Sequence, residues 1–365
     1  MDAMCTIMRC ALILLAAGVL LAGGCAESTS PVVSPGPPRT YMMGFSGIPP
    51  RADTGAAIQS ILLWSQRADA AIMSSELPWD SLLSGVPAES IIAKDILGLA
   101  NFYRGRGLEI WVYVDPANGL NRGAEADALE RRGRSMTEPE IQQIYRSYVV
   151  AIDTIVHPDH LGLALETNLI RLASSAPLYA ALRQAVNDGA ADVRSVDPAV
   201  PLSVSVQVDA AWGRLTGGTY LGVDTDFVHF PFIQELGLSS YPYLAGFTDP
   251  DSVPLNYYSR LVEGRLILTA VTEGGWTSSS LGGTISSPET QKRYIVRQME
   301  LLDSARAVAV FQLTFTDLDL SGVALPPGSI LPLFAHLGLV DINLNPKPAL
   351  AAWDGAFLRK RSNLK

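Results

Sequence analysis

The sequence predicts a closed barrel of eight parallel β-strands, each followed by a helix. Three observations predict this fold. Eight short apolar segments alternate with eight segments of helical spacing. The alternation fills about 320 residues, which is the size of such a barrel. Two of the apolar segments in the middle and late chain also end in a glutamate, and a strand's carboxyl end is where barrels of this kind build their active sites.

The expected strands are Tyr41–Gly47, Ala70–Glu76, Leu108–Asp115, Leu161–Glu166, Leu202–Asp209, Gly237–Tyr243, Leu266–Glu273 and Ala307–Thr314. The expected helices are Thr54–Arg67, Ala88–Arg106, Glu138–Val156, Ala176–Val193, Phe227–Gln234, Asp251–Val262, Pro288–Ser304 and Leu331–Phe357. An open, doubly wound sheet is the alternative. It would carry a Gly-x-Gly-x-x-Gly phosphate turn after an early strand, and the sequence has none.

Side-chain alternation favours closure of the barrel. One face of the fourth strand carries Gly162, Ala164 and Glu166. The corresponding face of the seventh strand carries Ile267, Thr269, Val271 and Glu273. Small residues suit a crowded barrel interior, so we expect these faces to point inward and both glutamates to reach the barrel mouth.

The first 39 residues are not expected to belong to the barrel. Ala11–Gly23 is apolar but short for a membrane span, and Leu21–Cys25 resembles a bacterial lipobox. Residues 1–25 are therefore predicted to be a lipoprotein signal peptide with Cys25 lipidated; an ordinary secretory peptide is the alternative. Residues 26–39 read as a flexible tether, 40–358 as the barrel and 359–365 as a basic, solvated tail. We expect the protein in the bacterial cell envelope, lipid-anchored and facing the periplasm or exterior.

Composition excludes several functions. All three cysteines lie in the leader, so the barrel has no disulfide and no cysteine site. A net charge of −9 argues against nucleic acid as the partner. His157 and His160 precede the fourth strand, at the end of the barrel opposite the expected site, and no Gly-x-Ser-x-Gly motif is present. We expect a monomer with no cofactor and no metal.

Two carboxylates at one barrel mouth suit the cleavage of a glycosidic bond. One must be protonated to release the leaving oxygen, and the other must be ionised to attack the anomeric carbon. Repulsion between them raises the pKa of one member. The alternative is a purely structural role, in which Glu166 and Glu273 cap helices or pair with arginines at the rim of the barrel.

The chain resembles clan A glycoside hydrolases, the retaining barrel glycosidases that include cellulases, mannanases and endo-galactanases. Glu166 after the fourth strand matches the clan's acid/base, and Glu273 in Val271–Trp276 matches its nucleophile. Tyr241, at the end of the sixth strand, matches the tyrosine that hydrogen-bonds the nucleophile. Phe334–Leu339 and Asn345–Ala349 look like the closing segment of these enzymes. The resemblance implies a polysaccharide or oligosaccharide substrate with β-linkages.

Other polar and aromatic residues near the strand ends are candidates for substrate binding. They are Glu76, Asp115, Asn168, Gln207, Trp212, Tyr243 and Trp276. Trp276 is the expected platform for a sugar ring, while core packing is the alternative for each aromatic residue. The charged, glycine-dotted insert Asn118–Arg134 lies on the same face, as a cleft wall or as a solvated loop.

Two departures from the clan pattern leave other functions open. Leu165 stands where the clan has an asparagine, and Phe311–Phe315 lacks the tryptophan usual on the eighth strand. A barrel that binds glycans without cleaving them is therefore the second hypothesis. A barrel enzyme of unrelated chemistry is the third.

Overall fold

The structure, a computed structural model, describes residues 36–325 and 328–362. Within these ranges eight parallel strands form a closed barrel in chain order, with the last strand paired to the first. The strands are β1 Met42–Ser46, β2 Ala70–Glu76, β3 Glu109–Asp115, β4 His160–Gly162, β5 Leu202–Gln207, β6 Glu235–Ser240, β7 Leu268–Gly274 and β8 Ala309–Gln312. The predicted (β/α)8 barrel is confirmed.

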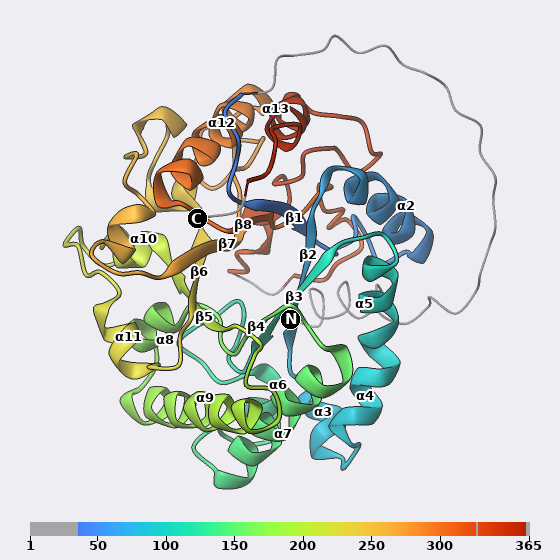
Figure 1. Cartoon of the computed structure of the whole chain (residues 1–365), viewed down its shortest axis with the longest axis vertical. Helices are drawn as coiled ribbons and strands as arrows, with labels where there is room; N and C mark the ends of the chain where they lie inside the picture. Colours follow the sequence, from blue (N-terminus) through green and yellow to red (C-terminus); the bar gives the residue numbers. More distant parts are fainter. Residues whose placement is uncertain (1–35, 326–327, 363–365) are drawn as a thin grey trace.

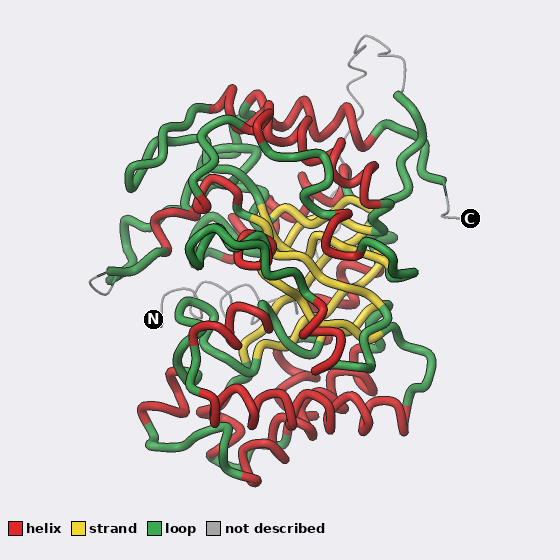
Figure 2. The backbone as a smooth tube through the Cα atoms, turned by 90° about the vertical axis from the view of Figure 1, so that its left-hand side faces the viewer, coloured by secondary structure: helices red, strands yellow, loops and turns green. Residues whose placement is uncertain are grey.

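Helices surround the strands, as Figure 1 shows, and Figure 2 places the strands between helices on opposite sides. The helices are α2 Thr54–Trp64, α3 Trp79–Leu83, α4 Ala88–Asp95, α5 Leu97–Arg104, α6 Asp127–Arg131, α7 Pro139–Val156, α8 Thr167–Ala173, α9 Ala176–Val196, α10 Val208–Ala211, α11 Asp224–His229, α12 Pro288–Ala305 and α13 Pro348–Phe357. Short 3-10 turns are η1 Ser65–Arg67, η2 Pro242–Ala245, η3 Pro250–Ser252, η4 Ser259–Val262 and η5 Leu331–Phe334. Side chains cap several helix starts; Asp53, for example, accepts from the Ala56 N–H at 2.6 Å.

The buried side chains form two layers. Inside the barrel, one cluster joins side chains from opposing strands: Met42, Ala70, Ile72, Trp111, Tyr113, Leu165, Ala270, Ala309 and Phe311. A larger cluster lies between the strands and the helices. The lumen is tightly filled, since a Cβ on Gly162 would lie 2.1 Å from the Tyr113 ring. Residue 162 must therefore be glycine for this core to pack.

Several expected elements end earlier than predicted. The fourth strand ends at Gly162, and the sixth runs from Glu235 to Ser240 because Pro242 cannot donate a ladder hydrogen bond. The expected helix 251–262 is instead η3 and η4, because Pro254 removes a helical N–H. The expected helix 331–357 is η5 and α13, separated by a segment that contains Gly338 and Pro346.

The predicted alternation holds at Gly162 and fails near both glutamates. Ala164 packs in the outer cluster and Leu165 in the lumen, the reverse of the expectation. On β7, Ala270 faces the lumen and Val271 faces the helices, again the reverse. Both glutamates therefore reach the mouth through local irregularities, described below, and not through simple alternation.

The two ends of the described chain lie against each other. Arg39, expected in the tether, is buried and pairs with Asp69 at 2.7 Å. Arg359, expected in a solvated tail, donates to the Tyr41 hydroxyl and pairs with Asp303 at 2.9 Å. Arg39 and Arg361 also form an isolated parallel bridge. Both expected boundaries are therefore corrected: the folded unit extends at least from Arg39 to Arg361.

Candidate active site

Glu166 lies directly after β4 in an unusual backbone conformation. Its φ of 50° and ψ of 46° fall in the left-handed region, which few residues other than glycine adopt. The Ser205 hydroxyl of β5 accepts the Glu166 N–H at 2.9 Å and holds this turn in place. Strained residues of this kind concentrate at functional sites. The turn redirects the carboxylate toward the mouth, although β4 has already ended.

Glu273 reaches the same mouth because of a bulge in β7. Leu238 of β6 is level with Val271, but the next residue, Ser239, is level with Glu273. Thr272 is thus an extra residue on β7, and it restores the inward direction that alternation from Ala270 would have lost. The bulge sets the direction of the Glu273 carboxylate.

Ser239 joins the two glutamates. Its hydroxyl oxygen lies 2.6 Å from Oε1 of Glu166 and 2.7 Å from Oε1 of Glu273. Because both distances meet at one atom, the two Oε1 atoms are at most about 5.3 Å apart. This upper limit lies below the ~6.5–9.5 Å of inverting glycosidases and is compatible with the closer pair of retaining ones.

The insert after β3 contributes an arginine that sequence reasoning missed. Arg122 is buried and donates from Nε to Oε2 of Glu166 at 2.8 Å. Its NH1 donates to Oδ2 of Asp115, at the end of β3, at 2.6 Å. The insert is therefore a wall of the site. Its charged and glycine-rich composition gave no signal that one arginine would turn inward.

Glu76, at the end of β2, lies beside this ion pair. Its Oε1 accepts the Gly119 N–H at 3.1 Å, and its side chain is exposed to solvent. Although part of the residue reaches solvent, desolvation of its carboxyl among the neighbouring groups and the charge of Asp115 raise the pKa of Glu76. Burial also raises the pKa of Asp115, while Arg122 opposes that rise. Four carboxyl groups thus surround one guanidinium, and the site favours protonation of at least one of them.

Glu273 is the carboxyl most affected. Burial and then the charge of Glu166 raise its pKa to about 7, while Arg122 and the Ser239 hydroxyl act in the opposite direction. Arg122 contacts Glu166 directly and does not contact Glu273. In the free protein, burial and the surrounding charges therefore favour a proton on Glu273. The first step of a retaining reaction needs the reverse distribution.

Tyr241 lies beside the pair in a buried position. Burial, followed by the charges of Glu273 and Glu166, raises the pKa of its phenol well above the usual value. Among the described residues, no hydrogen bond joins its hydroxyl to Glu273. Its ring meets Phe334 edge-on, with the ring centroids 5.1 Å apart. In the free protein, Tyr241 is therefore near Glu273 but does not form the hydrogen bond that the family resemblance predicts.

The carboxyl pair is flanked by a network of hydrogen-bonded polar residues, formed by Asp209, Gln207 and Asn168. Asp209 is fully buried; it accepts from the Tyr257 hydroxyl, from Gln207 Nε2 at 2.8 Å and from the Tyr241 N–H at 3.2 Å. The Asn168 amide exchanges two hydrogen bonds with the Gln207 main chain, at 2.8 and 2.9 Å. These polar groups are occupied by protein, so the structure does not support substrate contacts for them.

The expected aromatic platforms differ in exposure. Trp276 is 0% exposed, because its ring packs on Tyr243 and Tyr294 and its Nε1 donates to Ser286. Tyr243 is also buried and donates to Leu333 O at 2.9 Å. Neither ring offers a face to a sugar, so those two expectations are not supported. Trp212 remains partly exposed.

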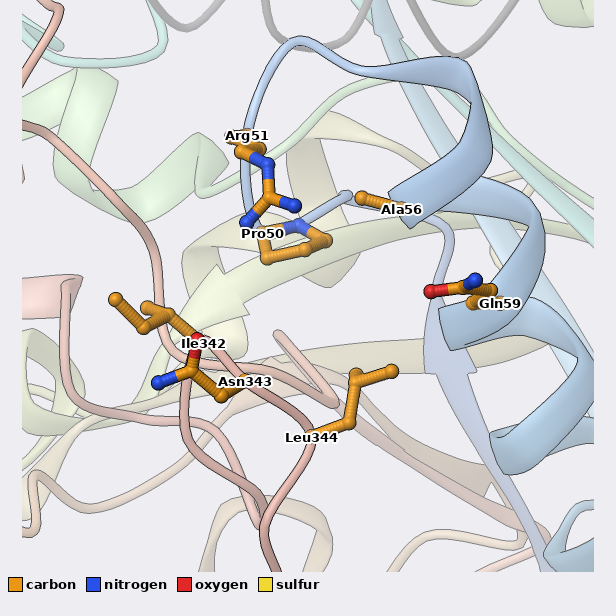
Figure 3. Close-up of a pocket in the computed structure, with 7 residues that line it drawn as sticks. All are labelled: Pro50, Arg51, Ala56, Gln59, Ile342, Asn343 and Leu344. Atoms are coloured by element: carbon orange, nitrogen blue, oxygen red, sulfur yellow. The ribbon is translucent and has the colours of Figure 1, made fainter.

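Two cavities open on the surface, and the paired glutamates line neither. One, of about 410 Å³, is lined by Trp212, Arg214 and Gly218. The other, of about 200 Å³, lies between the β1–α2 loop and the segment before α13, and Figure 3 shows its lining: Pro50, Arg51, Ala56, Gln59, Ile342, Asn343 and Leu344. The geometry of the carboxyl pair, rather than cavity size, identifies the candidate site.

Other expectations concern metals and membranes. Among the described residues, no group of three or more His, Cys, Asp or Glu side chains is arranged to hold a metal ion. No helix in the described ranges is long and apolar enough to cross a bilayer. Cys25 and residues 1–25, the expected signal peptide, lie outside the described residues.

Comparison with known proteins gives the fold a wider context. No family model and no curated protein matches the sequence. Among solved structures, an exo-β-1,4-mannosidase from Opitutaceae bacterium strain TAV5 matches with a TM-score of 0.64 and 15% identity, over 90% of this chain and 62% of that one. A β-glucuronidase from an uncultured Clostridium species matches with a TM-score of 0.59 and 13% identity, over 87% of this chain and 50% of that one. Native xylanase 10B from Thermotoga maritima also gives 0.59, at 14% identity, over 87% and 95%.

The chain has a TIM-barrel fold, which it shares with these three glycosidase structures. It spans only about half to three fifths of the glucuronidase and the mannosidase, and nearly all of the xylanase. At these identities the likeness shows the fold alone. The TIM barrel predicted from the sequence is confirmed, and the glycosidase activity and the roles of Glu166, Glu273 and Tyr241 stay predictions.

Proposed function

We propose that the protein is a retaining glycoside hydrolase that cleaves a β-linked glycan. One observation carries the proposal: Glu166 and Glu273 follow or end β4 and β7, and one hydroxyl holds their Oε1 atoms within about 5.3 Å of each other. So close a pair favours a double displacement, in which one carboxylate attacks the anomeric carbon directly, over an inverting reaction that needs a water between the carboxyls and the sugar. The glycosidase-like fold supports the proposal.

In the proposed reaction Glu273 attacks the anomeric carbon while Glu166 protonates the leaving oxygen. The resulting glycosyl ester on Glu273 is then hydrolysed by a water whose proton Glu166 accepts. Arg122 and Asp115 hold Glu166 in orientation from the side opposite Ser239. Glu76, the exposed carboxyl at the same mouth, is placed to accept hydrogen bonds from substrate hydroxyl groups.

A panel of aryl β-glycosides and β-linked polysaccharides tests the proposal. The panel includes mannosides, glucuronides and xylan, in line with the printed names of the matched structures. Wild type should release sugar from at least one member, and Glu166→Gln and Glu273→Gln should not. Glu235→Gln, a buried carboxyl at the other end of the barrel, is the matched control. Azide should restore turnover to Glu273→Ala as a glycosyl azide of inverted configuration.

Glycan binding without cleavage is the second candidate function. Arg122 forms an ion pair with the Glu166 carboxylate, which would otherwise be free to donate a proton. Leu165 packs in the lumen, at the position where the clan has an asparagine that contacts the sugar. A glycan array combined with product analysis separates the two functions. Binding with no released sugar, equal in wild type and Glu273→Gln, would favour this second candidate.

We propose further that the protein is a monomer anchored in the bacterial cell envelope through a lipid on Cys25, facing the periplasm or exterior. The Leu21–Cys25 segment and the Ser- and Pro-rich residues after it support this location. Metabolic labelling with a fatty-acid analogue should mark the wild type and not Cys25→Ser. Equal labelling of both proteins would contradict the anchor.

A further inference from the structure

The hydroxyl of Ser239 occupies a position that the family resemblance did not single out. Ser239 is fully buried near the end of β6, and the β7 bulge places it level with Glu273. Its oxygen is within 2.7 Å of both glutamates, so it is the atom through which the two carboxyls are linked. The neighbouring Ser240 is equally buried but accepts from the Tyr258 hydroxyl at 3.1 Å.

Hydrogen counting constrains this bridge. A serine hydroxyl has one hydrogen, so it can donate to only one of two carboxylate oxygens. The second short contact is a hydrogen bond only if the other carboxyl is protonated and donates to the serine oxygen. The bridge is therefore satisfied when the pair holds a single proton.

We propose that Ser239 is a positioning residue that passes this single proton from Glu273 to Glu166. The inference rests on the proposed function, because the proposed reaction requires the proton on Glu166 and the charge on Glu273. The structure shows the free protein with Arg122 on Glu166, which favours the opposite arrangement. A route between the two carboxyls is thus needed, and Ser239 contacts both ends of it.

The transfer is balanced in protons. Glu273 gives its carboxyl proton to the Ser239 oxygen while the Ser239 hydroxyl proton moves to Oε1 of Glu166. Ser239 ends as a neutral hydroxyl, donating now to Glu273, and the net charge of the pair is unchanged. A substrate oxygen near Glu166 and an anomeric carbon near Glu273 would both favour the second state.

The charged and titratable groups around the pair come from several elements. Arg122 and Asp115 act from the β3 end and its loop, and Tyr241 acts from the β6 end. Glu76, from β2, acts through Asp115. Removing the Ser239 hydroxyl leaves all of these in place. A change in titration can therefore be assigned to the bridge.

Three variants test the proposal: Ser239→Ala, Ser239→Thr, which retains a hydroxyl, and the matched control Ser240→Ala. Two readouts are used on the full chain. Infrared difference spectroscopy follows protonation of the buried carboxyls across pH, with Glu273→Gln and Glu166→Gln to assign the bands. The pH profile of kcat/KM follows activity on a glycoside that wild type hydrolyses.

Ser239→Ala should move the Glu273 titration to higher pH, because the ionised carboxylate loses a donor, and should lower kcat by about 10²-fold with little change in KM. Ser239→Thr should restore both, and Ser240→Ala should behave as wild type. If Ser239→Ala matches Ser240→Ala in both readouts while wild type is active, the proposal is overturned and the proposed function stands. If wild type cleaves no glycoside yet the titration moves in Ser239→Ala, the shared proton is supported and the glycosidase function fails.

Discussion

The two ends of the barrel each bury a carboxylate, and they treat it differently. At the amino-terminal end, Glu235 meets His160 at 2.6 Å, and His160 stacks on Trp111 with 3.7 Å between ring centroids. At this end, one buried carboxylate is paired with one histidine ring. At the carboxyl-terminal end, the buried Asp115 and Glu166 share the Arg122 guanidinium, and Glu273 and Glu76 lie close enough to feel its charge. A buried carboxylate with a partner of its own is typical of a structural role. Several carboxylates around a single cation cost free energy to bury, and such clusters are typical of functional sites.

The largest expected difference between the two ends is in activity. Glu166→Gln or Glu273→Gln should reduce glycoside hydrolysis by at least about 10³-fold, because each removes an essential proton donor or nucleophile. Glu235→Gln should retain kcat, since it lies at the opposite end. Rates on the best substrate of the panel measure all three. If Glu235→Gln lost as much hydrolytic activity as the other two variants, the two ends of the barrel would not differ in function.

The next effect is on stability at the mouth. Arg122→Met leaves Glu166 and Asp115 buried without a cation, and we expect a loss of about 3–5 kcal/mol in the free energy of unfolding near pH 8. The loss should shrink toward acid pH, because burial raises the pKa of Asp115 and the removal of Arg122 takes away the charge that opposes this rise. Arg134→Met, which breaks exposed ion pairs with Glu138 and Glu140, is the control and should unfold like wild type. Urea denaturation near pH 8 and at acid pH measures the difference, and an Arg122→Met protein as stable as the control would refute it.

A smaller effect is expected at the other end. His160→Ala removes the hydrogen-bond partner of Glu235 and the ring that stacks on Trp111, at a cost of about 1–3 kcal/mol. Its kcat should equal that of wild type once the protein is folded. Urea denaturation and rate measurements on the same preparation check both statements. A selective fall in kcat would mean that the lower cluster also contributes to the reaction.

A further effect, which appears only as the pH is varied, is a slope in the pH dependence of stability. The pKa of Glu273 rises from about 4.5 in the unfolded chain to about 7 in the folded protein. The folded state therefore binds the extra proton between these values, and its stability falls as pH rises through this window. Glu273→Gln should flatten that slope and be the more stable protein above pH 7. Unfolding free energies measured from pH 5 to 8 test the sign, and a steeper fall in the variant would contradict it.

The sequence predicted the barrel and the strand positions of both glutamates, because these depend on periodicity and on where apolar segments end. It did not predict how the glutamates turn inward. The left-handed turn at Glu166 and the extra residue Thr272 both interrupt the alternation on which that prediction relied. Both irregularities depend on contacts with neighbouring strands, such as Ser205 with the Glu166 N–H.

Residues that act across the barrel were the hardest to predict. Ser239 and Arg122 come from segments distant in sequence from Glu166 and meet it only in the folded barrel. Nothing in their local sequence distinguishes them from a strand serine and a loop arginine. Conversely, Trp276 follows a strand end as expected but packs into the core, because Tyr243 and Tyr294 cover its ring. A position just after a strand end therefore does not predict whether an aromatic ring is exposed to a substrate.

Covalent trapping tests the central claim most directly. The 2-deoxy-2-fluoro analogue of the glycoside that wild type hydrolyses should form a stable ester, because the fluorine slows release more than formation of the intermediate. Peptide mass spectrometry should then place one added sugar on Glu273, and Ser239→Ala should label more slowly. A sugar attached to Glu166, or hydrolysis that proceeds with no trapped ester, would contradict the assignment of Glu273 as the nucleophile.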